Sequence, residues 1–387
     1  MKTQVGIVGS GPSGLLLAQI LHRNGIDSVI LERRSRSYVE GRIRAGVIEQ
    51  GAVDMLTEAG VGKRMAQEGL VHEGFDIALN GRRTRVDLAA LTGGNTVTVY
   101  GQTEITKDLI EARLEMGGTI IFEADDVTPR GFDTDAPVLS FTRNGEAHEL
   151  ECDFIAGCDG YHGVCRASFP TGTINSFERV YPFAWLGVLV EAPPPSEELI
   201  YCRDTRGFAL HSMRSMGVSR SYLQCSPNED LNEWPDERVF EELQLRLGDS
   251  ATVNSGKVLE KSVTPMRSFV AEPLRSGRMF LAGDAGHIVP PTGAKGLNLA
   301  ASDIHYLATG LIDYFTTGNE AGLDAYSSKA LQRIWKAQRF SWWMTTLLHN
   351  AGGDGFEDRI HLAELEYTLS SEAALKSLAE NYTGLPY

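Results

Sequence analysis

The sequence predicts an α/β fold, α+β overall, in which an inserted β-sheet domain interrupts a parallel-sheet domain and a helical region ends the chain. Three observations support this prediction. Strand, helix and strand patterns alternate over the first 32 residues, as in the βαβ unit of a parallel sheet. Short β-rich segments separated by Pro, Gly and Ser occupy residues 176–268, and a helical pattern dominates from residue 300 onward.

The elements follow in order along the chain. Residues 4–8 (QVGIV) and 28–32 (SVILE) read as buried strands, and residues 13–24 between them have helical periodicity that ends at Gly25. Further helical segments are predicted at 46–68 and 103–117, and further strands at 119–123, 138–142, 152–157, 183–190, 199–202, 207–213, 219–225 and 279–282. The expected domains are 1–175 and 269–349 for the two parts of the parallel-sheet domain, 176–268 for the inserted sheet, and 350–387 for a C-terminal helical interface region.

Composition and charge exclude several classes of function. The chain carries a formal net charge of −15, which makes nucleic acid or an anionic membrane surface a poor partner. No signal-peptide pattern and no run of about 18 apolar residues is found, so we expect a cytoplasmic protein without a membrane segment. The five cysteines include no Cys-x-x-Cys pair, which argues against a flavin disulfide reductase. No metal site is expected.

The first candidate site is the sequence Gly9-x-Gly11-x-x-Gly14 between the first strand and the first helix. In such a turn one glycine allows the sharp bend, one lets the backbone approach a pyrophosphate, and one lets the helix pack on the strand. Glu32 ends the second strand, where a carboxylate accepts hydrogen bonds from a ribose. This Rossmann-like pattern predicts one tightly held dinucleotide. Since no second fingerprint exists, any second dinucleotide must bind elsewhere.

Two further strand ends carry an aspartate. Asp159 follows the strand in IAGCDG (155–160), and Asp284 follows the strand in LAGD (281–284). A helix begins near Gly296, soon after Asp284. A helix start carries free N–H groups and a positive dipole end, which stabilise negative charge on a bound cofactor.

These motifs together resemble a known family. GSGPSG (9–14), GCDG (157–160) and GDAGH (283–287) are similar to the three motifs of the single-component flavoprotein aromatic hydroxylases. The similarity extends over the whole chain in the stretches 42–51, 69–74, 97–104, 178–187, 290–303 and 380–387. The resemblance implies bound FAD and hydroxylation of 4-hydroxybenzoate to 3,4-dihydroxybenzoate with NADPH and O2, through a flavin C4a-hydroperoxide.

The resemblance also implies roles for single residues. FAD would be held by Gly9, Gly11, Ser13, Gly14, Glu32, Arg42, Arg44, Gln102, Asp159, Asp284, Leu297 and Asn298. The aromatic carboxylate substrate would be held by Tyr201, Ser212, Arg214, Tyr222, Pro291 and Thr292, with Arg214 on the carboxylate because a guanidinium fork matches it. Tyr201, Tyr382 and His72 would relay the phenol proton, with the carbonyl of Pro291 beside the reacting ring. A histidine suits this relay because it titrates near neutral pH.

The resemblance implies a transient site for the electron donor and a homodimer. Arg33, Tyr38 and Arg42 lie in the basic loop after Glu32, and guanidinium groups there suit the 2′-phosphate of NADPH. His162, Arg166 and Arg267 are candidates to complete this site. The apolar cluster Trp342, Trp343, Leu347 and Leu348 is expected to form the dimer contact, with burial inside the monomer as the alternative.

Some alternatives remain open at the level of sequence. Ser10 and Gly286 stand where alanine is commoner in the family, and His211 beside Ser212 would alter substrate choice if it turned inward. The same chemistry on another benzoate, such as a 3-hydroxy or 4-amino analogue, is one alternative. A catalytically silent flavoprotein fold used as a binding module is another.

Overall fold

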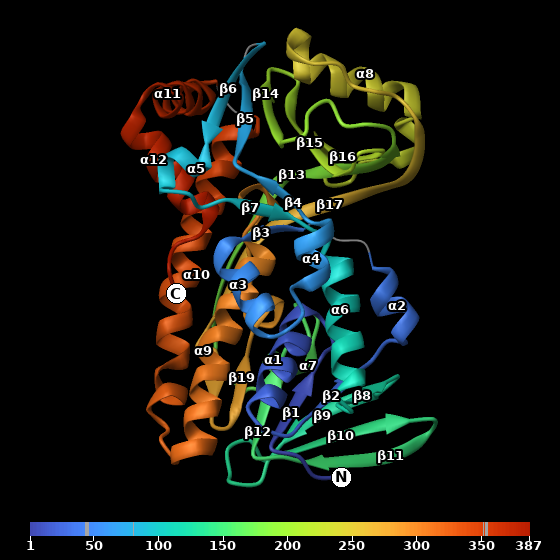
Figure 1. The fold of residues 1–387 in the computed structure, drawn as a ribbon, viewed down its shortest axis with the longest axis vertical. Coiled ribbons are helices and arrows are strands. Elements are labelled where there is room, and N and C mark those ends of the chain that lie inside the picture. The colour runs from blue at the N-terminus through green and yellow to red at the C-terminus, as the bar shows by residue number, and fades with distance from the viewer. Residues whose placement is uncertain (43–45, 80, 351, 353–354) are drawn as a thin grey trace.

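The computed structural model describes residues 1–42, 46–79, 81–350, 352 and 355–387 (Figure 1). A six-stranded sheet forms the base of the molecule, in the order β18-β19-β12-β1-β2-β8. Its strands are Arg275–Ser276 (β18), Met279–Leu281 (β19), Phe154–Gly157 (β12), Val5–Val8 (β1), Ser28–Glu32 (β2) and Thr119–Phe122 (β8). All neighbouring pairs are parallel except β18 with β19.

The parallel sheet joins segments that are distant in the sequence. Strand β19 pairs directly with β12, with Ala156 opposite Phe280, so the chain returns to its first sheet after the inserted domain. Helix α1 (Pro12–Arg23) packs against α6 (Gln102–Glu115) and α9 (Gly296–Thr317). This arrangement confirms the predicted Rossmann-like domain with an insertion.

The inserted sheet is larger than the sequence predicted. It has eight strands in the order β20-β17-β13-β16-β15-β14-β5-β6. These are His287–Ile288 (β20), Lys257–Glu272 (β17), Asn175–Glu191 (β13), Val218–Cys225 (β16), Gly207–Ser215 (β15), Ile200–Asp204 (β14), Gly74–Leu79 (β5) and Arg82–Asp87 (β6). The boundary predicted at 175/176 is therefore wrong for residues 74–87. They join the sheet through parallel pairing of β5 with β14, a long-range contact that no local turn signals.

The two faces of this sheet have different covers. The outer face packs against α8 (Asp236–Leu247), with Val239, Leu243 and Leu247 in its core. The sequence interpretation missed this helix and assigned only strands to the region. The inner face carries Phe75, Tyr201 and Phe208, which pack with side chains of the C-terminal helices.

Smaller elements complete the fold. A three-stranded sheet contains Asp125–Arg130 (β9), Val138–Arg143 (β10) and Glu146–Glu151 (β11), and a second contains Val47–Glu49 (β3), Val97–Val99 (β7) and Leu70–His72 (β4). The short helices are Arg36–Gly41 (α2), Gln50–Glu58 (α3), Lys63–Glu68 (α4), Leu88–Thr92 (α5) and Val164–Ala167 (α7). The helix predicted over 46–68 is thus a strand and two helices, interrupted between Ala59 and Gly62.

The C-terminal helices connect the two large sheets. Helix α10 (Ala321–Leu348) extends from the Rossmann-like domain to the inserted sheet, and α11 (Phe356–Ser370) and α12 (Glu372–Thr383) lie beside that sheet (Figure 1). The chain end then returns along α10, where Arg333 Nη1 donates to the carbonyls of Leu385 (2.6 Å) and Pro386 (3.0 Å).

The apolar cluster expected at a dimer contact is largely internal. Leu347 and Leu348 are only 3% and 1% exposed, because the end of α10 lies under the inserted sheet. Trp343 is half-buried, and only Trp342, at 41%, is exposed. The alternative of burial inside the monomer therefore applies to both leucines.

Three general features of the described residues concern membrane spans, metal sites and cysteines. No helix in the described part of the chain is long and apolar enough to cross a bilayer. The same residues contain no group of three or more His, Cys, Asp or Glu side chains that could hold a metal ion. All five cysteines are buried thiols.

Candidate active site

The glycine turn at the start of α1 has the geometry of a phosphate-binding loop. Gly9 has a φ of +102°, and a Cβ there would lie 2.4 Å from the carbonyl oxygen of Cys158. A Cβ at Gly14 would lie 2.1 Å from the carbonyl oxygen of Gly9. A Cβ at Gly11 would meet no described atom within 4 Å, so this backbone faces open space. Two glycines thus allow packing, and the third leaves the N-terminus of α1 accessible to a ligand.

Glu32 is held at the end of β2 by the turn itself. Its Oε2 accepts hydrogen bonds from the backbone N–H (2.8 Å) and hydroxyl (2.9 Å) of Ser10, and its Oε1 accepts from the N–H of Arg34 (2.7 Å). The serine that departs from the commoner alanine therefore orients the carboxylate. A carboxylate has about four acceptor positions, so Glu32 retains capacity for a ribose hydroxyl.

Asp159 has a structural partner. Its Oδ2 accepts from the N–H of Cys165 (2.8 Å), which satisfies an N–H at the start of α7, and burial raises the pKa of this carboxyl. Its Oδ1 is buried without a hydrogen-bond partner among the described residues. The structure thus explains why an acid is needed here and leaves one oxygen for a further donor.

Asp284 lies in a turn that buried residues hold in place. It is exposed, while its neighbours Gly283 and Ala285 are buried. The buried Oδ2 of Asp303 accepts from the N–H of Gly283 (2.8 Å) and from Nε2 of His287 (2.6 Å). Burial opposes the charged ring, but the Asp303 carboxylate raises the pKa of His287 overall. The sequence interpretation did not identify this pair, although both residues lie in the quoted stretches 283–287 and 290–303.

An apolar cleft opens between the starts of α1 and α9. It is lined by Pro12, Ser13, Leu16, Ile48, Leu297 and Ala300, among others. Leu299 is the first residue of α9 whose N–H meets a backbone carbonyl, that of Lys295 (2.8 Å). The N–H groups before it are the unsatisfied donors of a helix start. Both helix starts therefore border the same cleft.

The remaining predicted FAD residues differ in what the structure shows. Three hydrogen bonds hold the side chain of Asn298: Oδ1 accepts from the N–H of Glu49 (2.9 Å), and Nδ2 donates to the carbonyls of Val47 (3.0 Å) and Ala294 (2.8 Å). Both amide protons are thus used, so the backbone N–H is the donor left for a ligand. Arg44 lies outside the described residues.

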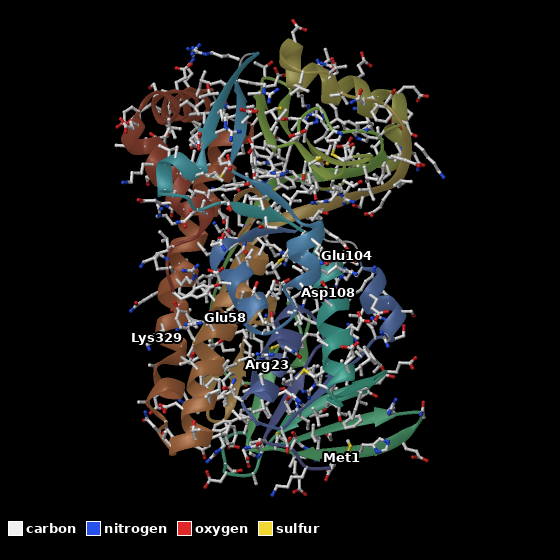
Figure 2. The ribbon with its side chains drawn as sticks, viewed as in Figure 1. Met1, Arg23, Glu58, Glu104, Asp108 and Lys329 are labelled. Atoms are coloured by element: carbon white, nitrogen blue, oxygen red, sulfur yellow. The ribbon has the colours of Figure 1, made fainter. Side chains whose placement is uncertain are left out.

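Arg42 and Gln102 lie close together at the start of α6. Gln102 is the first residue of that helix, and the carbonyl of Arg42 accepts from the hydroxyl of Thr103 (2.8 Å). Helix α6 is fixed by Arg64 of α4, which pairs with Glu104 and with Asp108 (3.0 Å), one turn apart on α6 (Figure 2). The helix start that bears Gln102 is therefore well anchored.

The Asp284→Ala variant tests the flavin assignment. A charged hydrogen bond contributes about 1.5–3 kcal/mol, so we expect FAD affinity to fall by about tenfold or more. Titration of apoprotein with FAD measures this directly, without turnover. Asp135→Ala serves as the matched control, since Asp135 is 95% exposed and pairs with Arg278 away from the cleft. Equal FAD affinity in wild type and Asp284→Ala would contradict the assignment.

Strand register places the predicted substrate residues on one face of the inserted sheet. Leu210 lies opposite both Tyr201 of β14 and Tyr222 of β16, so the three side chains share a face. Residues two positions apart on a strand also share a face, which adds Ser212 to it. The register shifts between Met213 and Ser215, and Arg214 at this irregularity interacts with Tyr222. Tyr201 and Tyr222 pack with side chains of the C-terminal helices.

Arg214 has a donor with no partner. Its Nη1 is buried without a hydrogen-bond partner among the described residues. Burial lowers the pKa of this guanidinium, with Tyr222 as the main opposing influence. A buried donor of a charged group is costly to leave without a hydrogen-bond partner. A carboxylate ligand would supply that partner with matching geometry.

Tyr201 and Tyr382 form a buried hydroxyl pair. Their hydroxyl oxygens are 2.8 Å apart, and the hydroxyl of Tyr201 also lies 3.2 Å from the carbonyl oxygen of Thr292. Both side chains are 1% exposed, and burial raises the pKa of each phenol, so both are neutral at pH 7. Pro291 and Thr292 form the turn just before α9. The predicted phenol site and the flavin helix start are thus adjacent.

His72 differs from the expectation in two ways. Burial, and secondarily Arg85, lower the pKa of His72 to about 4, so it does not titrate near neutral pH as predicted. Both ring nitrogens are buried without a hydrogen-bond partner among the described residues. The described contacts therefore do not join His72 to Tyr382 directly, and a relay between them requires an intervening group such as a water.

His211 turns away from the predicted substrate residues. It lies between Ser212 and Leu210 on β15, so its side chain points to the opposite face, where Nδ1 lies 3.4 Å from the hydroxyl of Ser221. Alternation along the strand thus removes it from contact with the substrate face.

The predicted NADPH residues form two groups. Arg33 and Arg34 are exposed after Glu32, but it is Arg34, not Arg33, that stacks on Tyr38, at 5.0 Å from the ring centroid. His162, Arg166 and Arg267 surround Tyr161, with Arg166 and Arg267 each 4.8 Å from its ring. Arg166 also donates to the carbonyl of Ala285 (2.7 Å), beside Asp284. Among the contacts of the described residues, none joins the two groups.

Comparisons with known proteins agree with this geometry. The family described as "FAD binding domain" matches residues 2–341. The chain is 55% identical to a p-hydroxybenzoate hydroxylase of Acinetobacter baylyi, covering 100% of this chain and 96% of that protein. It is 26% identical to a rifampicin monooxygenase of Rhodococcus hoagii, covering 84% and 67%. The structure of p-nitrophenol 4-monooxygenase from Pseudomonas putida has a TM-score of 0.85 at 19% identity, with both chains fully covered, which shows a shared fold.

Proposed function

Because the chain belongs to the FAD-binding-domain family of flavin-dependent aromatic monooxygenases, we propose that it hydroxylates 4-hydroxybenzoate to 3,4-dihydroxybenzoate with NADPH and O2. One observation carries the choice of substrate. Arg214, whose Nη1 has no partner among the described residues, lies beside Tyr222, and Tyr201 on the same sheet pairs its hydroxyl with that of Tyr382 on α12. A benzoate with a para-hydroxyl presents a carboxylate at one end and a phenol at the other, and so matches both.

The protein side chains perform binding, orientation and proton transfer. Arg214, with Ser212 and Tyr222, holds the carboxylate and fixes the ring in its plane. The hydroxyl of Tyr201 accepts the phenol proton while its own proton passes to Tyr382, and Tyr382 releases its hydroxyl proton through an intervening water toward His72 and the solvent. The ring then carries the negative charge and is more nucleophilic. Bound FAD supplies the redox chemistry, taking up electrons from the reduced nicotinamide and activating O2.

Burial keeps water from this site. The phenol end is closed by Phe75, whose ring centroid is 5.4 Å from that of Tyr201 and 4.4 Å from that of Tyr382. The C-terminal helix α12 supplies Tyr382, so the end of the chain completes the enclosure. Excluding water favours oxygen transfer to the ring over wasteful release of hydrogen peroxide.

A panel of benzoates tests the proposed function. Purified protein is supplied with NADPH, O2 and, in turn, 4-hydroxybenzoate, 3-hydroxybenzoate, 4-aminobenzoate and benzoate. We expect hydroxylated product equal to most of the NADPH consumed only with 4-hydroxybenzoate. If hydroxylated product forms from another of these benzoates instead, that compound is the substrate. A colourless protein without FAD would support the alternative of a catalytically silent binding module.

We also propose NADPH as the preferred donor, bound by the arginines after Glu32. Arg33 is exposed, and Arg36 pairs with Glu40 (2.6 Å), so Arg33 and the stacked Arg34 are the guanidinium groups best placed to meet a 2′-phosphate. A basic loop on a chain of net charge −15 also attracts a phosphorylated donor.

The Arg33→Glu variant tests this assignment. We expect flavin reduction by NADPH to slow by about tenfold, since a charged contact of about 1.5–3 kcal/mol is lost, while reduction by NADH changes little. Stopped-flow measurements with 4-hydroxybenzoate present compare both donors. Arg143→Glu, an equal charge change on the exposed hairpin of β10, is the control. If wild type reacts as fast with NADH as with NADPH, the phosphate assignment fails.

A homodimer remains part of the proposal, with a revised contact surface. Helix α11 exposes Phe356 (67%), Ile360 (54%) and Tyr367 (61%) at helical spacing, which places them along one side. Exposed apolar side chains gathered on one helix commonly mark an interface.

The buried thiols of all five cysteines support a reducing, cytoplasmic location.

Mass measurement at micromolar concentration checks the dimer. We expect Ile360→Asp to shift wild-type dimer toward monomer, because a buried charge without a partner is unfavourable at an interface. Leu245→Asp makes the same chemical change at a 47% exposed residue of α8 and is expected to stay dimeric. A monomeric wild type would contradict the dimer itself.

A further inference from the structure

A buried histidine packs against the same inner sheet face that carries Tyr201. His349 follows the last residue of α10 and is 1% exposed. The indole Nε1–H of Trp185 donates to Nε2 of His349 (2.7 Å), so Nε2 carries no proton. Nδ1 lies 2.9 Å from the carbonyl oxygen of Thr345 and therefore carries the proton and donates. The two contacts together specify one tautomer.

The environment keeps this ring neutral. Burial is the main cause that lowers the pKa of His349 to about 3, the Thr345 carbonyl opposes it, and Arg203 adds to it. The ring stacks on Phe183 at 4.5 Å between centroids and 5° between planes, and on Phe208 at 4.3 Å. A neutral, hydrogen-bonded and stacked imidazole has a single orientation.

Trp185 connects His349 to Tyr222, one of the predicted substrate residues. Its ring centroid lies 4.7 Å from that of Tyr222 and 5.2 Å from that of Phe208. Gly187, two residues along β13, lies opposite Tyr222, and a Cβ there would be 3.2 Å from the Tyr222 ring. Tyr222 therefore lies against Trp185, and a shift of the indole would displace it.

Thr345 connects the same histidine to the phenol end of the site. The single proton of its hydroxyl goes to the carbonyl of Ser341 (2.7 Å), so the hydroxyl of Thr292 donates to Thr345 Oγ1 (3.0 Å). The carbonyl of Thr292 in turn faces the hydroxyl of Tyr201 (3.2 Å). The end of α10 is also fixed to the sheet, because Gln224 Nε2 donates to the carbonyl of Asn350 (2.5 Å). One buried set of contacts thus runs from Trp185 through His349 and Thr345 to Thr292 and Tyr201.

We propose that His349 is a positioning residue that sets the distance between the carboxylate end and the phenol end of the substrate site. It acts through Trp185 on Tyr222 and through Thr345 on Thr292, and it touches neither the substrate nor FAD. This inference rests on the proposed function, because the two ends are defined by 4-hydroxybenzoate.

Two substitutions separate hydrogen bonding from packing. His349→Phe keeps the stacking on Phe183 and Phe208 but leaves the Trp185 N–H without its acceptor. It also removes the side-chain donor to the Thr345 carbonyl, which keeps the backbone N–H of position 349 (3.1 Å) as its partner. His349→Gln restores one acceptor and one donor. We expect the dissociation constant of 4-hydroxybenzoate to rise about tenfold in His349→Phe and to return to within about threefold of wild type in His349→Gln. FAD content should be equal in all three proteins.

A control distinguishes positioning from a general loss of stability. Leu347→Ala removes a 3% exposed side chain at the same helix end, and should lower the melting temperature without changing the 4-hydroxybenzoate dissociation constant. Imidazole ¹⁵N shifts of wild type should show a proton on Nδ1 alone between pH 6 and pH 9, a range far above the lowered pKa. This readout does not depend on whether the Phe variant folds.

The outcomes are distinguishable. Wild type that binds no 4-hydroxybenzoate overturns the proposed function and this inference with it. Wild type that binds, with unchanged affinity in His349→Phe, overturns the inference alone. If His349→Gln binds 4-hydroxybenzoate as weakly as His349→Phe, the two hydrogen bonds do not position the site and the inference is overturned. A proton on Nε2 of wild-type His349 would overturn it as well.

Discussion

Replacing Tyr201 with phenylalanine is expected to leave FAD and 4-hydroxybenzoate bound while hydroxylation falls by roughly 100-fold, the lower range for loss of a proton-transfer group. The hydroxyl of Tyr201 is buried and has two partners, Tyr382 at 2.8 Å and the carbonyl of Thr292 at 3.2 Å. Phenylalanine keeps the ring and its packing against Phe75 but cannot accept the phenol proton. Without that transfer the bound ring stays a neutral phenol, which is a weak nucleophile.

The measurement compares product with NADPH consumed. The variant should oxidise NADPH with hydrogen peroxide as the main oxygen product, and it should show no ionised 4-hydroxybenzoate in its bound absorption spectrum. Tyr181→Phe is the matched control, since that hydroxyl is also in the inner-face cluster but bonds Ser268 (3.2 Å). Full yield of 3,4-dihydroxybenzoate from Tyr201→Phe would remove the hydroxyl pair from the mechanism.

Arg214→Lys is expected to weaken 4-hydroxybenzoate binding more than about tenfold, or about 1.4 kcal/mol. The substitution keeps the positive charge but loses the planar fork that bonds both carboxylate oxygens. Because the guanidinium Nη1 is buried without a partner among the described residues, we expect a substrate carboxylate to satisfy it. Retention of charge means that loss of affinity reports geometry rather than electrostatic attraction.

Equilibrium titration of the oxidised enzyme with 4-hydroxybenzoate gives the affinity. Arg206→Lys, in the turn between β14 and β15 and paired with Glu242 on α8, is the control and should bind as wild type does. Phenols that lack the carboxylate of 4-hydroxybenzoate should bind the Arg214→Lys variant and wild type equally weakly. Normal binding of 4-hydroxybenzoate to Arg214→Lys would place the anchor elsewhere.

Local patterns in the sequence determined the nucleotide-binding half of the molecule. The strand, glycine turn, helix and strand of residues 5–32 depend on contacts between near neighbours, and the structure has them where the sequence predicted. The strands that precede Asp159 and Asp284 were also predicted, because a buried strand followed by Gly or Asp is a local signal. Strand alternation, once the register was known, placed Ser212 on one face and His211 on the other.

Tertiary structure alone decided which distant segments meet. The pairing of β5 with β14 moved residues 74–87 into the inserted sheet, and the path of α10 buried Leu347 and Leu348. The contacts of His349 with Trp185, and the lowered pKa of His72, depend on desolvation and on partners from other elements. The sequence by itself determined residue types and local periodicity, which fixed the chemistry available. Burial and long-range pairing, which depend on the whole fold, decided how each of these groups is charged and which partner it has.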